Sequence, residues 1–159
     1  MTLFPINQKN LYGLENELNE LITLYKNAKL PNKILLSGQK GIGKSTLAYH
    51  LINYILSNNE DFSYDLNKYL INDQNRSFKL IQNNSNPNFT LIDVPEEKKV
   101  IDINQIRSLI SNLKKSSFND KPRFVLIDNI EYLNTNSINA LLKILEEPSE
   151  NVFFILIHN

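Results

Sequence analysis

The chain contains the stretch KILLSGQKGIGKST at residues 33–46. Its first part, 33–37, is a short apolar run that predicts a strand, and the residues after the stretch, 47–55, carry apolar side chains at helical spacing. Residues 38–45 match the pattern G-x-x-x-x-G-K-S of a P-loop, in which a glycine-rich turn joins a strand to a helix. The stretch therefore predicts an α/β fold built around a phosphate-binding loop.

The P-loop pattern assigns a chemical role to each kind of residue in it. Its glycines let backbone N–H groups turn inward around phosphate oxygens, and the helix that follows adds partial positive charge. Lys44 is expected to reach the β- and γ-phosphates, and the hydroxyl of Ser45 is expected to bind Mg²⁺. The alternative, a glycine turn followed by lysine and serine by chance, is disfavoured by the strand and the helix on either side. We predict that ATP with Mg²⁺ is bound by Gly38, Gly41, Ile42, Gly43, Lys44, Ser45 and Thr46.

A magnesium site next to a P-loop requires a second acidic residue. The apolar run 124–127 predicts a strand that delivers Asp128 at its carboxyl end, where ligands bind in open α/β sheets. We predict that Asp128 and Ser45 hold the metal, the alternative being an ordinary turn aspartate at a strand end. The next residue, Asn129, is a neutral amide that cannot accept a proton from an attacking water. We therefore expect weak hydrolysis, with Glu131 as a weaker candidate base that should point elsewhere.

The other apolar patterns predict the remaining helices and strands. Strands are expected at residues 33–37, 89–94, 123–128 and 152–157. Helices are expected at about 10–28, after the P-loop, from Asp102 with Gln105 in a capping box, and from Asn134 or Thr135 to Pro148. The polar stretch 58–88 is the least patterned, and residues 64–71 and 77–82 could each form a short helix there. Strands that alternate with helices predict a parallel sheet covered on both sides.

Composition limits the class of protein. Of the 159 residues 42% are hydrophobic, which is enough for the core of one domain. Seventeen basic and seventeen acidic side chains cancel, so the chain has no bulk attraction to nucleic acid or membrane. The absence of cysteine excludes disulfides and thiolate metal sites and suits a cytoplasmic location. The longest apolar run, 152–157, is far shorter than the roughly 20 residues that cross a bilayer, so we expect no membrane partner.

Several runs of residues carry a resemblance to a known family. The longest are DNIEYLN at 128–134, NALLKILEEP at 139–148 and FFIL at 153–156, and shorter ones lie at 30–31, 87–89 and 103–107. Together with the P-loop, they resemble the bacterial DNA polymerase III clamp-loader subunits of the AAA+ class. The resemblance is nearest to the delta-prime subunits, because no glutamate follows Asp128 and the zinc-binding cysteines of the gamma/tau subunits are missing.

The resemblance implies a three-layer P-loop AAA+ core over residues 1–159. Its parallel sheet should contain four strands, with the fifth, an edge strand, missing. By the same match Asn159 falls at the sensor 1 position, which adds it to the expected nucleotide contacts. The lid, the collar domain and the arginine finger of the family are not found in the sequence. We therefore expect the N-terminal part of a longer protein or a truncated gene product, and the sequence leaves both open.

The function that the resemblance implies is that of an ATP-binding subunit in DNA replication. It would help load the sliding clamp on primed DNA, within a hetero-oligomeric ring of other clamp-loader subunits. Two alternatives stay open. A small P-loop kinase would need a lid that bears arginines, and Arg76, Arg107 and Arg123 lie in no recognisable lid. The other alternative is a clamp-loader-like structural subunit with no nucleotide role.

Overall fold

The fold of the chain is given by a computed structural model, which describes residues 3–147 and 149–159. The chain divides into two compact units. The helical unit comprises Met1–Pro31 and Lys40–Asn86, and the sheet unit comprises Asn32–Gln39 and Pro87–Asn159. The boundary between the units falls within the P-loop. Gly38 and Gln39 belong to the sheet unit, and the loop from Lys40 onward belongs to the helical unit. Over the described ranges, no helix is long and apolar enough to cross a membrane.

In the part of the sheet unit that the structure describes, four parallel strands lie in the order β1-β4-β3-β2. The strands are β1 (Lys33–Ser37), β2 (Phe89–Ile92), β3 (Arg123–Ile127) and β4 (Val152–His158). The P-loop strand β1 is one edge of the described sheet, and the side chain of Leu35 on it is 59% exposed. The α/β class and the parallel sheet predicted from the sequence are confirmed.

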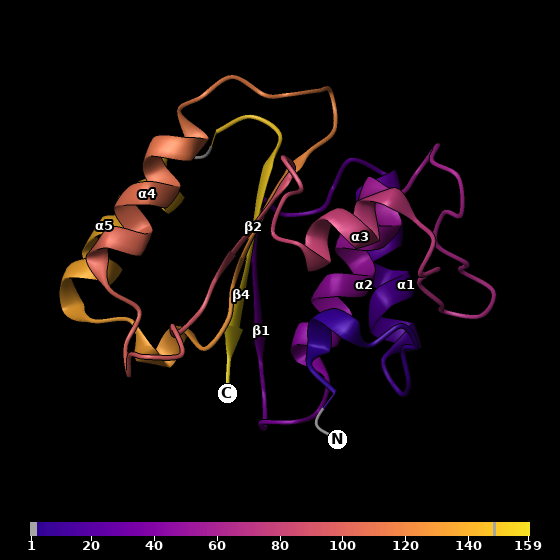
Figure 1. Ribbon diagram of the computed structural model, residues 1–159, viewed down its shortest axis with the longest axis horizontal. Coiled ribbons are helices and arrows are strands. Elements are labelled where there is room, and N and C mark those ends of the chain that lie inside the picture. The colour runs from indigo at the N-terminus through magenta and orange to yellow at the C-terminus, as the bar shows by residue number, and fades with distance from the viewer. Residues whose placement is uncertain (1–2, 148) are drawn as a thin grey trace. The chain divides into compact units, whose positions relative to one another are not determined.

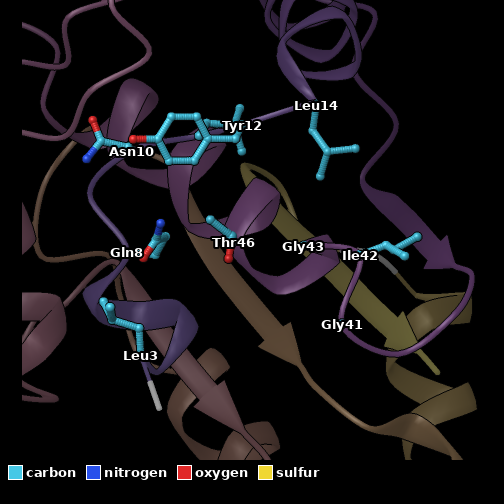
Figure 2. A pocket seen from close by; sticks show the side chains of 10 residues that line it. Leu3, Gln8, Asn10, Tyr12, Leu14, Gly41, Ile42, Gly43 and Thr46 are labelled. Carbon is cyan, nitrogen blue, oxygen red and sulfur yellow. The ribbon is translucent and has the colours of Figure 1, made fainter. Parts of the chain in front are cut away.

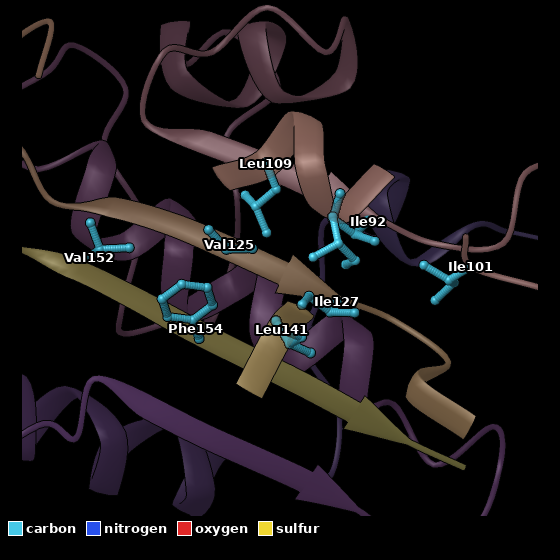
Figure 3. Close-up of a cluster of buried hydrophobic side chains, with 9 residues drawn as sticks. Ile92, Ile101, Leu109, Val125, Ile127, Leu141, Val152 and Phe154 are labelled. Carbon is cyan, nitrogen blue, oxygen red and sulfur yellow. The ribbon is translucent and has the colours of Figure 1, made fainter. Parts of the chain in front are cut away.

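Two helices cover one face of this sheet (Figure 1). They are α4 (Ile103–Leu113) and α5 (Thr135–Glu146), which lie side by side. Alternate residues of a strand share a face, so Val125 and Ile127 of β3 enter one buried cluster with Leu109 of α4 (Figure 3). Each such buried side chain stabilises the fold by about 1.5–3 kcal/mol. The cluster consists of Ile92, Ile101, Ile106, Leu109, Val125, Ile127, Leu141, Val152 and Phe154.

Side chains cap the amino ends of both helices. The carboxylate of Asp102 accepts two backbone hydrogen bonds from the first turn of α4 (2.9 and 3.3 Å), and Gln105 Oε1 accepts one from the Asp102 N–H (3.0 Å). The capping box predicted from the sequence is therefore confirmed. For α5, Asn134 Oδ1 accepts a first-turn N–H (2.8 Å), so Asn134 and not Thr135 is the cap. The predicted stop at Pro148 lies outside the described residues.

From residue 3 onward, the helical unit contains three α-helices and one short 3₁₀ turn. They are η1 (Pro5–Asn7), α1 (Glu15–Lys26), α2 (Lys44–Leu56) and α3 (Arg76–Gln82). The short helix considered at 77–82 is confirmed as α3. The first long helix begins later than the expected residue 10, because Gly13 lies at a φ of +75°, which right-handed helices do not contain.

The segment 64–71 is not a helix, contrary to one interpretation of the sequence. Asp65 and Leu70 exchange two backbone hydrogen bonds of 3.0 Å each and close a tight turn. The carbonyl of Tyr69 then accepts the N–H of Leu11 from the N-terminal segment (3.2 Å). These backbone pairings satisfy the groups that a helix would have paired internally.

His50 of α2 is fully buried and is held from both sides of its ring. Its Nε2 lies 3.0 Å from the carbonyl oxygen of Gln8, which can only accept, so Nε2 carries the hydrogen. Its Nδ1 therefore accepts from the hydroxyl of Tyr64 (2.7 Å), and burial raises the pKa of that hydroxyl. Burial also lowers the pKa of His50 to about 4, although the bond to Gln8 opposes this. The folded state therefore favours the neutral form of the His50 ring.

We expect His50 to make the stability of the chain depend on pH. Its folded pKa of about 4 lies below the ordinary value of 6.5, so the unfolded state binds the proton first as the pH falls. This group's contribution is complete above pH 6.5 and is lost between pH 6.5 and 4, at a cost of up to about 3 kcal/mol. Urea unfolding followed by circular dichroism across that range measures it. A His50→Gln variant should lose less stability on acidification, and parallel pH profiles for the two proteins would contradict the assignment.

Candidate nucleotide-binding site

The P-loop has a backbone path that depends on glycine. Gly41 lies at a φ of +88° and Gly43 at +94°, in the left-handed region that favours this residue. A Cβ atom on Gly43 would also lie 3.1 Å from Cδ1 of Leu14, closer than an ordinary contact. The backbone at Gly41 and Gly43 therefore favours glycine, and at Gly43 the space left by Leu14 also excludes a larger side chain.

The three residues after the loop form the first turn of α2. Lys44 is the first residue of the helix and only 6% exposed, and Ser45 and Thr46 follow it. The N-cap of α2 is Gly43, which offers no side-chain oxygen to the first turn. In this respect α2 differs from α4 and α5, which are capped by side chains. Ile42 at the tip of the loop is 49% exposed.

A cavity of about 230 Å³ lies beside the P-loop, wholly within the helical unit (Figure 2). The loop and the first turn of α2 form one of its walls, and the N-terminal segment forms the other. The lining residues are Leu3, Gln8, Asn10, Leu11, Tyr12, Leu14, Gly41, Ile42, Gly43 and Thr46. Carboxamides, aliphatic side chains and one aromatic ring therefore face the same space.

The backbone of the N-terminal wall of this cavity is held by hydrogen bonds to distant parts of the helical unit. His50 Nε2 donates to the carbonyl oxygen of Gln8, and the N–H of Ile71 donates to the carbonyl oxygen of Lys9 (2.9 Å). The N–H of Leu11, also in this wall, donates to the carbonyl oxygen of Tyr69 (3.2 Å). Sequence reasoning missed this wall, because no local pattern in residues 8–12 reveals the partners that position it.

The sheet unit gathers the other predicted residues at the carboxyl edge of its strands. Asp128 directly follows β3, Asn159 follows β4, and Gly38 follows β1. The last residues of β1 and β4, Ser37 and His158, pair in register, and Ser37 Oγ lies 3.2 Å from His158 Nδ1. Gly38 and Asn159 therefore leave neighbouring strands at the same edge. The rest of the predicted ligands belong to the helical unit.

Asn129 joins this edge through hydrogen bonds in three directions. Its backbone N–H donates to Asp128 Oδ1, its side-chain Nδ2 donates to Asp93 Oδ1, and its Oδ1 accepts from Asn159 Nδ2, each at 2.8 Å. The residue lies at a φ of +55°, a left-handed conformation in which asparagine is enriched. Asn129, expected only as a missing base, is thus the centre of a polar network.

Glu131 lies closer to this network than the sequence suggested. It belongs to the 3₁₀ turn η2 (Ile130–Tyr132), and its Oε2 accepts a long hydrogen bond from the backbone N–H of Asn159 (3.4 Å). The expectation that it points elsewhere fails because the tight turn brings its side chain back to the edge. Asp93 was missed altogether, although it follows the strand β2 just as Asp128 follows β3.

The chain has relatives among subunits of DNA polymerase III. The family described as "DNA polymerase III, delta subunit" matches residues 13–159. The DNA polymerase III subunit gamma/tau of Mycoplasma genitalium is 32% identical over 151 residues, which are 95% of this chain and 24% of that protein. The DNA polymerase III subunit delta' of Buchnera aphidicola subsp. Schizaphis graminum is 28% identical over 141 residues, 87% of this chain and 40% of that protein. The chain thus spans less than half the length of these relatives.

Solved structures share the fold of the chain. A DNA polymerase III gamma subunit-related protein of Thermotoga maritima superposes with a TM-score of 0.58 at 20% identity, over 87% of this chain and 39% of that one. The RuvB Holliday junction branch migration motor of the same organism gives 0.51 at 16% identity, over 98% and 42%. At these identities the likeness shows the fold alone, an α/β fold built on a parallel sheet. Because the family match covers nearly all of the sequence, the chain belongs to the DNA polymerase III delta subunit family.

Proposed function

We propose that the chain binds ATP with Mg²⁺ and serves as the nucleotide-binding part of a delta-prime-like clamp-loader subunit in DNA replication. The observation that carries the proposal is the P-loop, whose two left-handed glycines lead the chain into the first turn of α2 beside a cavity. Backbone N–H groups and a lysine at such a turn bind phosphate oxygens. The nucleotide is therefore assigned to the end of β1 and the start of α2.

The cavity suits the base of the nucleotide. Its volume of about 230 Å³ is smaller than the roughly 300–1,000 Å³ of sites that enclose a drug-sized ligand. Gln8 and Asn10 carry amides that both donate and accept hydrogen bonds, as the edge of a base requires. Tyr12, which is 73% exposed, offers a ring on which a base can stack. We assign the base to this cavity and the phosphates to the loop.

Ser45 and Asp128 are the residues that would hold Mg²⁺. Among the described residues, no group of three or more histidines and carboxylates is arranged to hold a metal ion without further ligands. Mg²⁺ is commonly bound by one or two protein groups together with phosphates and water. A hydroxyl and one carboxylate fit that pattern. The ion would neutralise charge on the phosphates, and the chain would supply two of its oxygen ligands.

We propose that the chain hydrolyses ATP weakly. The Asn129 amide stands where a base would follow Asp128, and its nitrogen and oxygen are already hydrogen-bonded to Asp93 and Asn159. An amide has no basic lone pair at neutral pH, so it cannot activate water. Glu131, whose carboxylate meets the backbone of Asn159, is the remaining candidate base.

The partners follow from the relatives. Those relatives are named as gamma, tau and delta' subunits of DNA polymerase III. We propose that this chain acts with other clamp-loader subunits in a hetero-oligomeric ring, on the sliding clamp and primed DNA, in the cytoplasm. A small P-loop kinase is disfavoured, because Arg76 and Arg107 lie on helices and Arg123 donates to the Leu113 carbonyl at the end of α4 (3.0 Å). The alternative, a subunit without a nucleotide role, predicts no binding of Mg-ATP, which the next experiment measures.

Replacing Lys44 should weaken the binding of Mg-ATP. Lys44→Ala removes the main side-chain charge facing the phosphates, so we expect the dissociation constant to rise about tenfold or more, equivalent to about 1.4 kcal/mol. Isothermal titration calorimetry measures the effect. Lys40→Ala, an exposed lysine in the same loop, is the matched control and should change affinity by less than about threefold. Equal affinities for the unsubstituted chain and Lys44→Ala would refute the proposal.

Replacing Tyr12 should distinguish the contribution of the base to binding from that of the phosphates. Tyr12→Ala removes a stacking surface worth about 1–3 kcal/mol, so Mg-ATP should bind about fivefold or more weakly. Magnesium tripolyphosphate, which has no base, should bind both proteins equally. A loss that is the same for both ligands would place Tyr12 near the phosphates, and no loss for either would remove the base from this cavity.

Replacing Asn129 by glutamate should not make the isolated chain an active ATPase. An arginine finger is worth roughly 10³ to 10⁵ in rate in P-loop enzymes. The proposed nucleotide contacts include none of the three arginines of this chain. We expect phosphate release by the unsubstituted chain and by Asn129→Glu to equal that of Lys44→Ala. Robust turnover by the unsubstituted chain that disappears in Glu131→Gln would instead identify Glu131 as the base.

A further inference from the structure

The hydrogen bonds of Asn129 have a direction that one residue imposes. The carboxylate of Asp93 can only accept, so it requires the Asn129 amide nitrogen to face it (2.8 Å). The amide oxygen of Asn129 then faces the opposite way and requires a donor, which is Asn159 Nδ2 (2.8 Å). A charge at residue 93 thereby sets the orientation of two neutral amides in turn.

Asp93 is itself held firmly on the edge of the sheet. Its Oδ1 also accepts the N–H of Val94 (2.7 Å), and its carbonyl oxygen accepts Nε2 of Gln105 (2.8 Å). Gln105 in turn closes the capping box of α4 with Asp102. We call the chain of hydrogen bonds from Asp93 through Asn129 to Asn159 the relay. The residue at its start, Asp93, is therefore held by α4, one of the helices that cover the sheet.

The end of the relay lies between the two phosphate-binding parts of the proposed site. In the strand order β1-β4-β3, β4 separates the strand that leads to Gly38 from the strand that leads to Asp128. Asp128 would hold the ion that neutralises charge on the phosphates. Asn159, which follows β4, would then lie beside the phosphates. Its Nδ2 donates one N–H to Asn129 Oδ1, on the side of β3 and Asp128, and the second N–H of the same nitrogen is the donor that a phosphate oxygen needs.

We propose that Asp93 is a positioning residue that, through Asn129, orients the Asn159 amide so that the site distinguishes ATP from ADP. This rests on the proposed nucleotide-binding function. Asp93 acts at a distance from the nucleotide and contributes no catalytic group. Its charge keeps Nδ2, the donor of the Asn159 amide, on the side of Asp128, where the acceptor Oδ1 would repel a phosphate.

The relay can be tested by exchanging its two residues. In Asp93→Asn the amide at 93 satisfies Asn129 in either orientation, so the direction is lost. In Asn129→Asp two carboxylates face each other and repel. In the double variant Asp93→Asn with Asn129→Asp, the carboxylate at 129 accepts from both neighbours, and the Asn159 amide regains its orientation. The pair is therefore expected to be coupled in function.

The measurement is the ratio of the dissociation constants for Mg-ADP and Mg-ATP. It is determined by calorimetry for the unsubstituted 159-residue chain, both single variants and the double variant, each checked for folding by circular dichroism. We expect each single substitution to lower this ratio. In the double variant the ratio should be about fivefold or more above the value expected if the two single effects simply multiplied. The charge-matched control combines Asn129→Asp with Asp120→Asn, an exposed carboxylate of the same unit, and should show coupling of less than about twofold.

The possible results separate the two proposals. Nucleotide binding with no coupling between 93 and 129 overturns the positioning role and leaves the proposed function intact. If Asn129→Asp does not fold, Asp93→Asn alone decides, because an unchanged ratio in that variant has the same meaning. Failure of the unsubstituted chain to bind either nucleotide overturns the proposed function and the positioning role with it.

Discussion

The site depends on the parallel, in-register pairing of the four strands. Because parallel strands end at one edge, the residues that follow β1, β4, β3 and β2 emerge there in a row, as Gly38, Asn159, Asp128 and Asp93. A slip of one residue would turn Val125 from the core face to the opposite face. The packing of α4 and α5 on the sheet therefore fixes the register, and the register fixes which polar side chains meet.

The parts of the fold that could be predicted are those encoded by neighbouring residues. The P-loop and its flanking strand and helix lie within one continuous stretch, and the capping box of Asp102 and Gln105 lies within one helical turn. Strands buried in a parallel sheet appear as short continuous apolar runs, which is why all four were found. Glycine at a φ of +94° could be expected at residue 43, because the motif places it just before the helix.

The parts that could not be predicted depend on contacts between distant residues. Asn129 and Asp93 are 36 residues apart, and the bond from His50 to the cavity wall at Gln8 spans 42. Residues 64–71 have apolar spacing that allows a helix, yet their backbone pairs with the N-terminal segment. Nothing local distinguishes Asp93 from other aspartates at strand ends until β2 is known to lie beside β3.

The amide at residue 129 is matched to its surroundings rather than merely lacking a charge. Asparagine donates to Asp93 and accepts from Asn159 at the same time, and a carboxylate can only accept. A glutamate there would face the carboxylate of Asp93 and lose one of these bonds, at the cost of like-charge repulsion in a partly buried place. The feature that removes the base therefore also completes the polar edge of the sheet. In this chain, weak hydrolysis and the orientation of the Asn159 amide would be two consequences of one hydrogen-bond arrangement.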